Sequence, residues 1–153
     1  MNHPATLGRD GIAQRIPHAG SMCLLDVLEA WDAEGLCCTA LSHRDPAHPL
    51  RSPQGLLAPV AIEYAAQAMA LHGALTAAPG TPPRPGYLAA VRSVVMRQPR
   101  LDTVAGALRI EARRQAAAEQ HAIYLFTVSD AAGRRLVEGR ATVVLNTPLE
   151  APT

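Results

Sequence analysis

Glu63 is the residue whose type and position most clearly point to chemistry. It lies in the segment AIEYAAQ at residues 61–67, among alanine and other largely apolar residues. Gln67 follows four residues later, so in a helix the two side chains share one face. The helix dipole favours a carboxylate in the first turns, whereas burial favours the protonated acid. A carboxyl group held between these effects suits general acid–base catalysis, and the structural alternative is a helix cap or an ion pair with arginine.

The six histidines are the candidate partners of this carboxylate. His48 lies ahead of Glu63 in a segment, 42–54, that is rich in proline and histidine and predicts a loop. His18 belongs to the tripeptide IPH near the N-terminus. Of the other four, we expect His43 in the same loop and His72 in the core or at a dimer contact. We expect His3 and His121 on the surface.

A long helix over residues 59–77 must position Glu63. Apolar residues recur there at spacings of three and four, which is helical periodicity, and alanine fills much of the remainder. Pro59 is tolerated at the start, and Pro79 with Gly80 ends the helix. Since charge is almost absent from every face, the pattern predicts a helix that is mostly buried and wrapped by the rest of the chain.

The rest of the sequence predicts strands that wrap this helix. Two apolar runs around a short polar turn indicate a hairpin, and the alternation of apolar and charged residues over 108–113 indicates a half-buried strand. We therefore expect one α+β domain over 1–153, with irregular tails at 1–11 and 146–153 and a curved antiparallel sheet around one helix. The predicted segments are a lead-in over 1–20 with a helical turn near 11–16, strands at 22–32, 36–41, 87–97, 107–114, 121–129 and 135–145, and a linker at 81–86.

Composition excludes several classes of function. With 14 basic and 13 acidic residues, the net charge is only +1, which is too small an excess of positive charge to indicate a nucleic-acid surface. Three cysteines without paired spacing predict neither a disulfide framework nor a metal site. The N-terminus does not resemble a signal peptide, and no apolar run is long enough to span a membrane. These features predict a cytoplasmic protein without a metal.

Two motifs carry a resemblance to a known family. The tripeptide IPH at 16–18, followed by MCLLDVL at 22–28, resembles the opening motif of hot-dog-fold 3-hydroxyacyl-(acyl carrier protein) dehydratases. EYAAQA at 63–68 is similar to their central-helix motif, and residues 86–88 and 108–111 fall where that family places its next strands. The resemblance covers roughly residues 12–145 and is greatest for the subgroup associated with aryl-polyene pigment biosynthesis.

The resemblance implies a hot-dog dimer that dehydrates a 3-hydroxyacyl thioester on phosphopantetheine, without a metal or other cofactor. In that family a histidine takes the α-proton, an acid on the helix serves the leaving hydroxyl, and a backbone N–H at the helix start polarises the thioester carbonyl. Glu63 matches the acid. The family's His-Phe-Pro-Gly segment is absent, and Pro49 occupies the position of its histidine, so His48 and His18 are the candidate bases. The expected substrate-binding residues are Gln67, Gly55, Pro59 and Tyr64.

Three functions remain open on the sequence. The first is a dehydratase of fatty-acid or polyene biosynthesis that works with acyl carrier protein, with Glu63 and His48 as its pair. The second is a non-catalytic or half-site subunit whose hot-dog partner supplies the histidine, so the chain forms either a homodimer or a heterodimer. The third is an acyl-thioester hydrolase, in which a carboxylate directs water. The sequence leaves open the acyl chain length and the choice between acyl carrier protein and coenzyme A.

Overall fold

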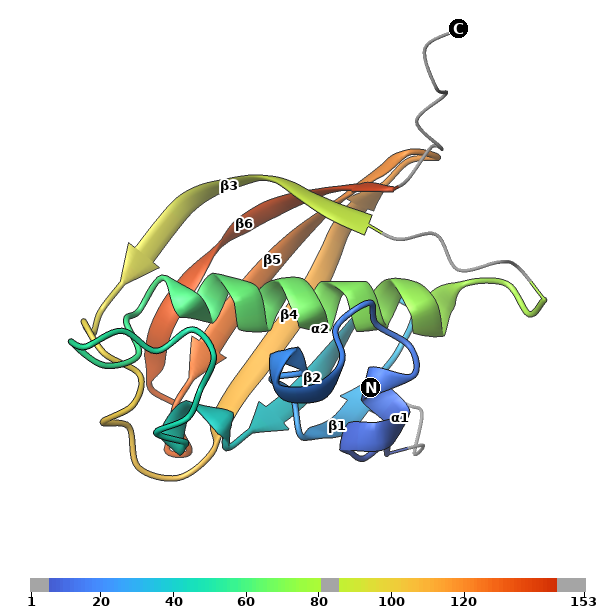
Figure 1. Cartoon of the computed structure of the whole chain (residues 1–153). Coiled ribbons are helices and arrows are strands. Elements are labelled where there is room, and N and C mark those ends of the chain that lie inside the picture. The colour runs from blue at the N-terminus through green and yellow to red at the C-terminus, as the bar shows by residue number, and fades with distance from the viewer. Residues whose placement is uncertain (1–5, 81–85, 146–153) are drawn as a thin grey trace, which may run out of the picture.

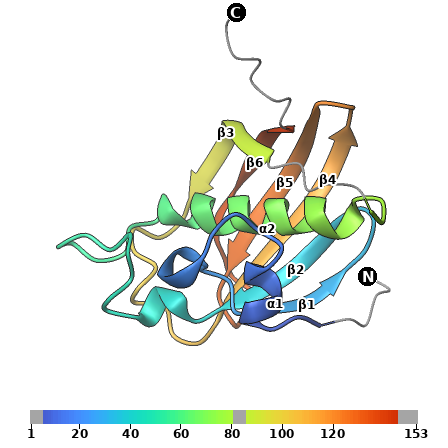
Figure 2. The same cartoon turned by 45° about the vertical axis from the view of Figure 1, so that its right-hand side comes forward.

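A computed structural model describes residues 6–80 and 86–145 of the chain. These residues form one six-stranded antiparallel sheet that curves around one long helix, α2 (Figure 1). A short helix, α1, lies beside the β1–β2 end of the sheet (Figure 2). The elements are α1 (Arg9–Ala13), β1 (Val27–Trp31), β2 (Gly35–Ala40), α2 (Val60–Thr76), β3 (Gly86–Met96), β4 (Leu108–Ala117), β5 (His121–Ser129) and β6 (Arg135–Leu145).

The strands follow the order β1-β2-β4-β5-β6-β3, and every neighbouring pair is antiparallel. On β4, Leu108, Ile110 and Ala112 are fully buried, whereas Arg109 and Arg113 are exposed and Glu111 is partly exposed. This alternation gives the sheet one apolar face. That face lies against α2, as the sequence predicted.

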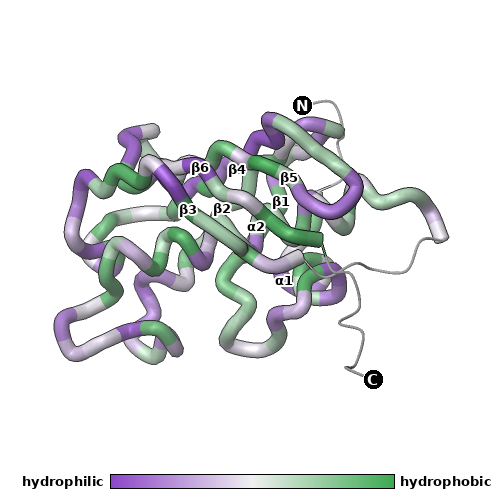
Figure 3. The backbone as a smooth tube through the Cα atoms, turned by 90° about the horizontal axis from the view of Figure 1, so that it is seen from above, coloured by the Kyte–Doolittle hydropathy of each residue, from purple (hydrophilic) through white to green (hydrophobic). Residues whose placement is uncertain are grey.

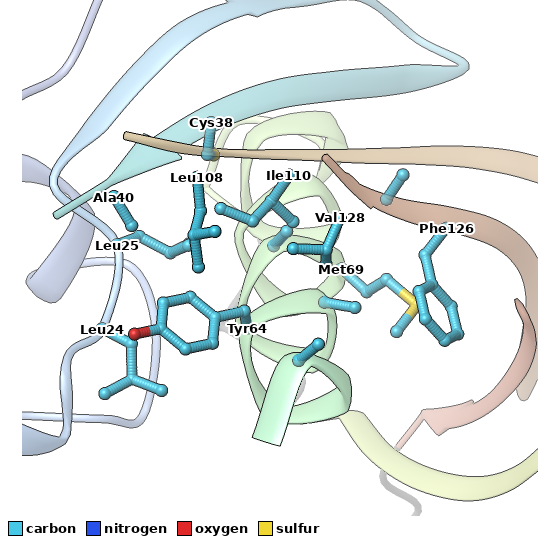
Figure 4. Packing of buried hydrophobic residues seen from close by; sticks show 14 of the residues in the cluster. Leu24, Leu25, Cys38, Ala40, Tyr64, Met69, Leu108, Ile110, Phe126 and Val128 are labelled. Atoms are coloured by element: carbon cyan, nitrogen blue, oxygen red, sulfur yellow. The ribbon is translucent and has the colours of Figure 1, made fainter. Parts of the chain in front are cut away.

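Helix α2 lies within one residue of the predicted limits at each end. Its core side includes Tyr64, Ala68 and Leu71, which are completely buried. Figure 4 shows the Tyr64 ring projecting from α2 toward Leu24, among the other buried side chains. Most of the helix is buried, as predicted, whereas Glu63 is partly exposed and the C-terminal turns from Gly73 onward are partly or fully exposed. One long strip of the helix is therefore open to a substrate or a partner.

The N-terminal third differs most from the predicted strand pattern. The first hairpin strand begins at Val27, and the residues ahead of it form a 3-10 turn, Gly20–Met22, and a loop. Residues 6–11 are not irregular, since Leu7 bridges Leu28 and α1 begins at Arg9. The remainder of the predicted lead-in (1–5), most of the linker (81–85) and the tail at 146–153 lie outside the described residues.

The sequence also led to expectations about the cysteines and about membrane-spanning helices. All three cysteines are buried and free, as small apolar residues would be. None of the helices in residues 6–80 and 86–145 has the length and hydropathy needed to cross a bilayer.

Candidate active site

Glu63 lies in the first turn of α2, where the helix dipole favours its charge. The backbone N–H groups of residues 60, 61 and 62 donate to the carbonyl oxygens of residues 57, 58 and 59, each at 3.0 Å. Pro59, the N-cap residue, has no N–H to offer. The first amides of the helix are thus occupied by their own chain, which leaves them poorly placed to polarise a thioester carbonyl.

The structure brings His18 to Glu63. Nε2 of His18 lies 3.0 Å from Oε1 of Glu63, and the side chains keep 26% and 33% of their accessible surface. Both groups are therefore open to a ligand while touching each other. An imidazole in contact with a carboxylate, at a partly exposed position, has the composition of a proton-transfer pair.

Gln67 holds the loop that carries His18 against the helix. Its Oε1 accepts from the N–H of Leu24 at 2.9 Å, and its Nε2 donates to the carbonyl of Met22 at 2.7 Å. The same Nε2 lies 3.2 Å from Oε1 of Glu63. Gln67 is fully buried, so the structure gives it a positioning role between loop and helix.

The two donors to Glu63 both use one oxygen. His18 lies 3.0 Å from Oε1 and Gln67 lies 3.2 Å from the same atom. If the acid is ionised, Nε2 of His18 carries the shared hydrogen. Nδ1 of His18 is buried and has no hydrogen-bond partner among the described residues. The pair thus makes its contact through Oε1, and the unpartnered Nδ1 of His18 is buried rather than open to a ligand.

The structure does not bring His48 to Glu63. Nδ1 of His48 accepts from the N–H of Leu50 at 3.0 Å, so its Nε2–H donates to the Tyr64 hydroxyl at 3.1 Å. Tyr64 in turn donates to Ser42 Oγ at 2.6 Å, because the Ser42 hydroxyl donates to the carbonyl of Leu24. His48 is 5% exposed and Tyr64 is fully buried, so both belong to a closed structural network.

Burial sets the protonation states in that network. It lowers the pKa of His48 and favours the neutral imidazole, which the hydrogen bonds of both ring nitrogens also require. It raises the pKa of Tyr64 to about 12, which keeps the phenol protonated. Neither group is placed to exchange protons with a substrate beside Glu63.

Gly55 lies under the start of α2 rather than beside Glu63. The N–H of Leu56 donates to Oδ1 of Asp102 at 3.0 Å, and Arg100 pairs with the other oxygen at 2.6 Å. Gly55 has a φ of +109°, and a Cβ there would lie 2.7 Å from Nε of Arg100 and from Oδ1 of Asp102. Only glycine allows this approach, so Gly55 fixes the loop that leads into the helix.

Sequence reasoning missed Asp102. The Arg100 guanidinium holds the pKa of this carboxyl well below its usual range, so it remains an anion that accepts from the loop. The aspartate follows a proline-containing turn and has no motif around it. Its role depends on two segments, 55–56 and 100–102, that meet only in the folded chain.

The remaining histidines have structural positions. His72 is completely buried, with Nδ1 bonded to the Tyr124 hydroxyl at 2.8 Å and Nε2 to the carbonyl of Asp32 at 2.9 Å, which confirms the expected core role. His43 is also buried, beside the carbonyl of Val104. His121 is exposed as predicted, and His3 lies outside the described residues.

A family model decides the identity of the chain. The model of ApeP-like proteins, described as ApeP dehydratase, matches residues 11–151. This chain belongs to the ApeP-like dehydratase family. The match confirms the resemblance to hot-dog dehydratases and to their aryl-polyene subgroup, and it makes the chain a dehydratase, which is a lyase that eliminates water. No curated protein matches this ApeP-like sequence.

Solved structures confirm the hot-dog fold of this ApeP-like chain. A chain of the dehydratase heterocomplex ApeI:P from Xenorhabdus doucetiae is similar with a TM-score of 0.76 and 23% identity, over 91% of this chain and 93% of that one. A thioesterase from Haemophilus influenzae is similar with a TM-score of 0.67 and 16% identity, over 98% of both chains. The E. coli PaaI protein of the phenylacetic acid degradation operon is similar with a TM-score of 0.60 and 12% identity, over 89% of this chain and 88% of that one.

Proposed function

We propose that this ApeP-like dehydratase eliminates water from a 3-hydroxyacyl thioester carried on the phosphopantetheine of an acyl carrier protein, with His18 and Glu63 as its acid–base pair. The contact of 3.0 Å between Nε2 and Oε1 carries the proposal, because the structure places no other histidine against this carboxylate among the described residues. His18 thus replaces His48 as the candidate base. Aryl-polyene biosynthesis is the pathway that the family favours.

The proposed reaction needs one proton removed and one delivered. His18 takes the proton from C2 of the acyl chain, and Glu63 donates a proton to the hydroxyl on C3. The C2–H and C3–O bonds break, a C2=C3 double bond forms, and water leaves. Because the two side chains touch, a proton can pass from His18 to Glu63 after each elimination, so the pair regenerates itself. None of these proton transfers needs a metal.

We further propose that β3 pairs with a second hot-dog subunit. β3 forms one end of the sheet, and Figure 3 shows the hydropathy of the residues along it. Two of its large apolar side chains are accessible, with Tyr87 59% and Leu88 38% exposed. An apolar edge strand of this length favours pairing with another sheet edge. The relative from Xenorhabdus doucetiae belongs to a heterocomplex by name, which favours a different hot-dog subunit over a second copy.

A heterodimer would also supply what this chain lacks. The helix-start amides are occupied by backbone carbonyls, and the His-Phe-Pro-Gly segment is absent. The partner subunit would then provide the donor for the thioester carbonyl, and the site would be complete only in the complex. A half-site role of this kind is the second candidate function. The cytoplasmic location of the protein, which the sequence suggested, remains a prediction.

The test is an assay of the purified chain, alone and together with the hot-dog subunit that co-purifies with it. Incubation with a 3-hydroxyacyl thioester should yield the 2-enoyl thioester, detected by mass spectrometry as a loss of one water. Full activity of the chain alone as a homodimer would remove the heterodimer proposal. Release of free thiol without an enoyl product would instead identify a thioester hydrolase and overturn the dehydratase assignment of this site.

A further inference from the structure

Arg9 connects helix α1 to the loop that carries His18. Its Nη2 donates to the carbonyl of Gly20 at 2.9 Å, and its Nη1 lies 3.4 Å from Oδ1 of Asp26. His18 lies two residues before Gly20, in the segment that runs between α1 and α2 (Figure 2). One guanidinium group therefore holds this loop at two points between His18 and the start of β1.

Asp26 fixes the guanidinium of Arg9 from the side of the sheet. Oδ2 of Asp26 accepts from the N–H of Leu41 at 2.6 Å, which leaves Oδ1 to face Arg9. The N–H of Asp26 donates to the carbonyl of Thr39 at 3.0 Å. The carboxylate is thus tied to β2 and the residue that follows it, and it directs the second arm of the guanidinium toward Gly20.

Helix α1 fixes the other end of the Arg9 side chain. Ile12, one turn after Arg9, is completely buried in the core. Just before the helix, Leu7 and Leu28 exchange two backbone hydrogen bonds, at 2.8 and 3.4 Å. The backbone of Arg9 is therefore anchored to the body of the protein, so the side chain can act as a strut between the core and the loop.

The backbone close to His18 has few other restraints. In the described part of the chain, neither Pro17 nor His18 makes a backbone hydrogen bond. The carbonyl of Gly20 accepts from the N–H of Cys23 at 3.1 Å, but this bond only closes the 3-10 turn on itself. The bond from Arg9 is the one that ties this turn to another element.

Arg9 and Gln67 hold different parts of the loop. Gln67 binds the backbone of residues 22 and 24, which lie four and six positions after His18. Arg9 binds the carbonyl only two positions after it. Because a restraint controls the residues nearest to it most strongly, the place of the His18 ring depends on the bond from Arg9 as well as on Gln67.

We propose that Arg9 is a positioning residue of the reaction, which keeps Nε2 of His18 against Oε1 of Glu63 by holding the carbonyl of Gly20. The inference rests on the proposed function for the role of His18, and it adds a residue of α1 to the site. Arg9 binds the loop rather than the acid–base pair. Its loss should therefore slow the proton transfers, which depend on placement within about 1 Å, more than it weakens substrate binding.

The kinetic test compares Arg9→Met and Arg9→Lys with the wild type, in complex with the co-purifying subunit. Methionine keeps an unbranched side chain but removes the donors, so kcat should fall about tenfold while KM stays within about twofold. Lysine restores one cationic donor and should bring kcat back to within about threefold of the wild type. An unchanged kcat in Arg9→Met would overturn the inference.

Arg113→Met is the matched control. Arg113 resembles Arg9 in exposure, with 48% and 41% of the side-chain surface accessible, and it also pairs with a carboxylate, that of Glu34 at 3.1 Å. It lies on β4 and does not contact the loop of His18. The loss of this arginine should leave kcat unchanged, which shows that removing a surface ion pair is not sufficient to slow the reaction.

A double-mutant cycle tests whether Arg9 acts through His18. In a His18→Ala background there is no imidazole left to position, so Arg9→Met should lower the residual kcat by less than about twofold. A tenfold loss in both backgrounds would show that Arg9 contributes independently of His18, and it would overturn the inference.

Amide hydrogen exchange separates this inference from the proposed reaction. In Arg9→Met the N–H of Cys23, which bonds to the carbonyl of Gly20, should exchange about tenfold faster, while the amide of Ala68 inside α2 keeps its rate. Faster exchange in a protein without dehydratase activity would remove the reaction and leave Arg9 as the group that holds the loop of His18. Unchanged exchange at Cys23 would overturn the inference whatever the activity.

Discussion

His18 and Glu63 meet at 3.0 Å although one belongs to the N-terminal loop and the other to the central helix. The loop reaches the helix because Gln67 binds the backbone of residues 22 and 24 from the turn that follows Glu63. Two motifs that looked independent in the sequence, IPH and EYAAQ, therefore form one site. Its residues touch each other without any group from a partner chain.

Replacing Glu63 by glutamine should abolish most dehydration. The amide keeps the size and can still accept from His18, but it cannot deliver a proton, so kcat should fall about 10²- to 10⁴-fold. The measurement is initial-rate formation of the enoyl thioester by the complex. Because Glu63 is a third exposed, the thermal unfolding midpoint should change little. Activity close to wild type in Glu63→Gln would remove this residue from the mechanism.

His18 and His48 should respond differently to substitution by alanine. His18→Ala should lower kcat by a similar factor to Glu63→Gln, with a small effect on unfolding. His48→Ala leaves the Leu50 N–H and Tyr64 hydroxyl without their buried partner, so unfolding should become easier by about 1–3 kcal/mol. Urea unfolding and the enoyl assay on the same two samples separate these effects. A stable but inactive His48→Ala, beside an active His18→Ala, would reverse the assignment.

Acidification should destabilise the protein in the range where histidine titrates. Burial lowers the pKa values of His43, His48 and His72, so the unfolded chain binds more protons than the folded one as pH falls below the ordinary value of about 6.5. The stabilising contribution is therefore complete above that pH. Between about pH 7.5 and 5.5 each group can remove up to about 1.4 kcal/mol of the free energy of unfolding.

Urea unfolding at fixed protein concentration measures this loss, with ionic strength held constant. NMR titration of the imidazole signals supplies an independent check, because the three buried rings should remain neutral at pH values where a free imidazole is half protonated. A free energy of unfolding that does not change with pH across this range would contradict the prediction.

Two glycines should give stability changes of opposite sign when replaced by alanine. At Gly55 the φ of +109° and the short approach to Arg100 and Asp102 leave no room, so Gly55→Ala should cost at least about 1–2 kcal/mol. Gly73 lies inside α2 with open space around it, so Gly73→Ala should stabilise by about 0.5–1 kcal/mol. Both are read from denaturant midpoints, and equal shifts in the same direction would contradict the geometric explanation.

The sequence predicted the elements more closely than it predicted their contacts. Helical periodicity and the flanking prolines placed α2 within one residue at each end, and alternation placed β4 and its neighbours. The pattern rule failed at residues 22–26, where an apolar run forms a loop because Gln67 satisfies its backbone. Local propensity contains no information about a hydrogen bond between residues so far apart in the chain.

The same reason explains which site residues were predicted. Glu63 stood out because a charge on an apolar helix is visible in the sequence alone. The choice between His18 and His48 depended on the path of two loops over the helix, which spacing does not determine. Asp102 could not be foreseen, because its partners at Gly55 and Leu56 come from a different loop.

The contacts of His18 and Gln67 with a single oxygen of Glu63 have a stereochemical consequence. They make the two carboxylate oxygens inequivalent, and in the proposed reaction we expect Oε2 to face the substrate. A chiral C3 can present its hydroxyl to that oxygen and its C2 hydrogen to His18 in only one configuration for a given direction of the acyl chain. In the proposed reaction a racemic 3-hydroxyacyl thioester should therefore stop at half conversion, with one enantiomer left.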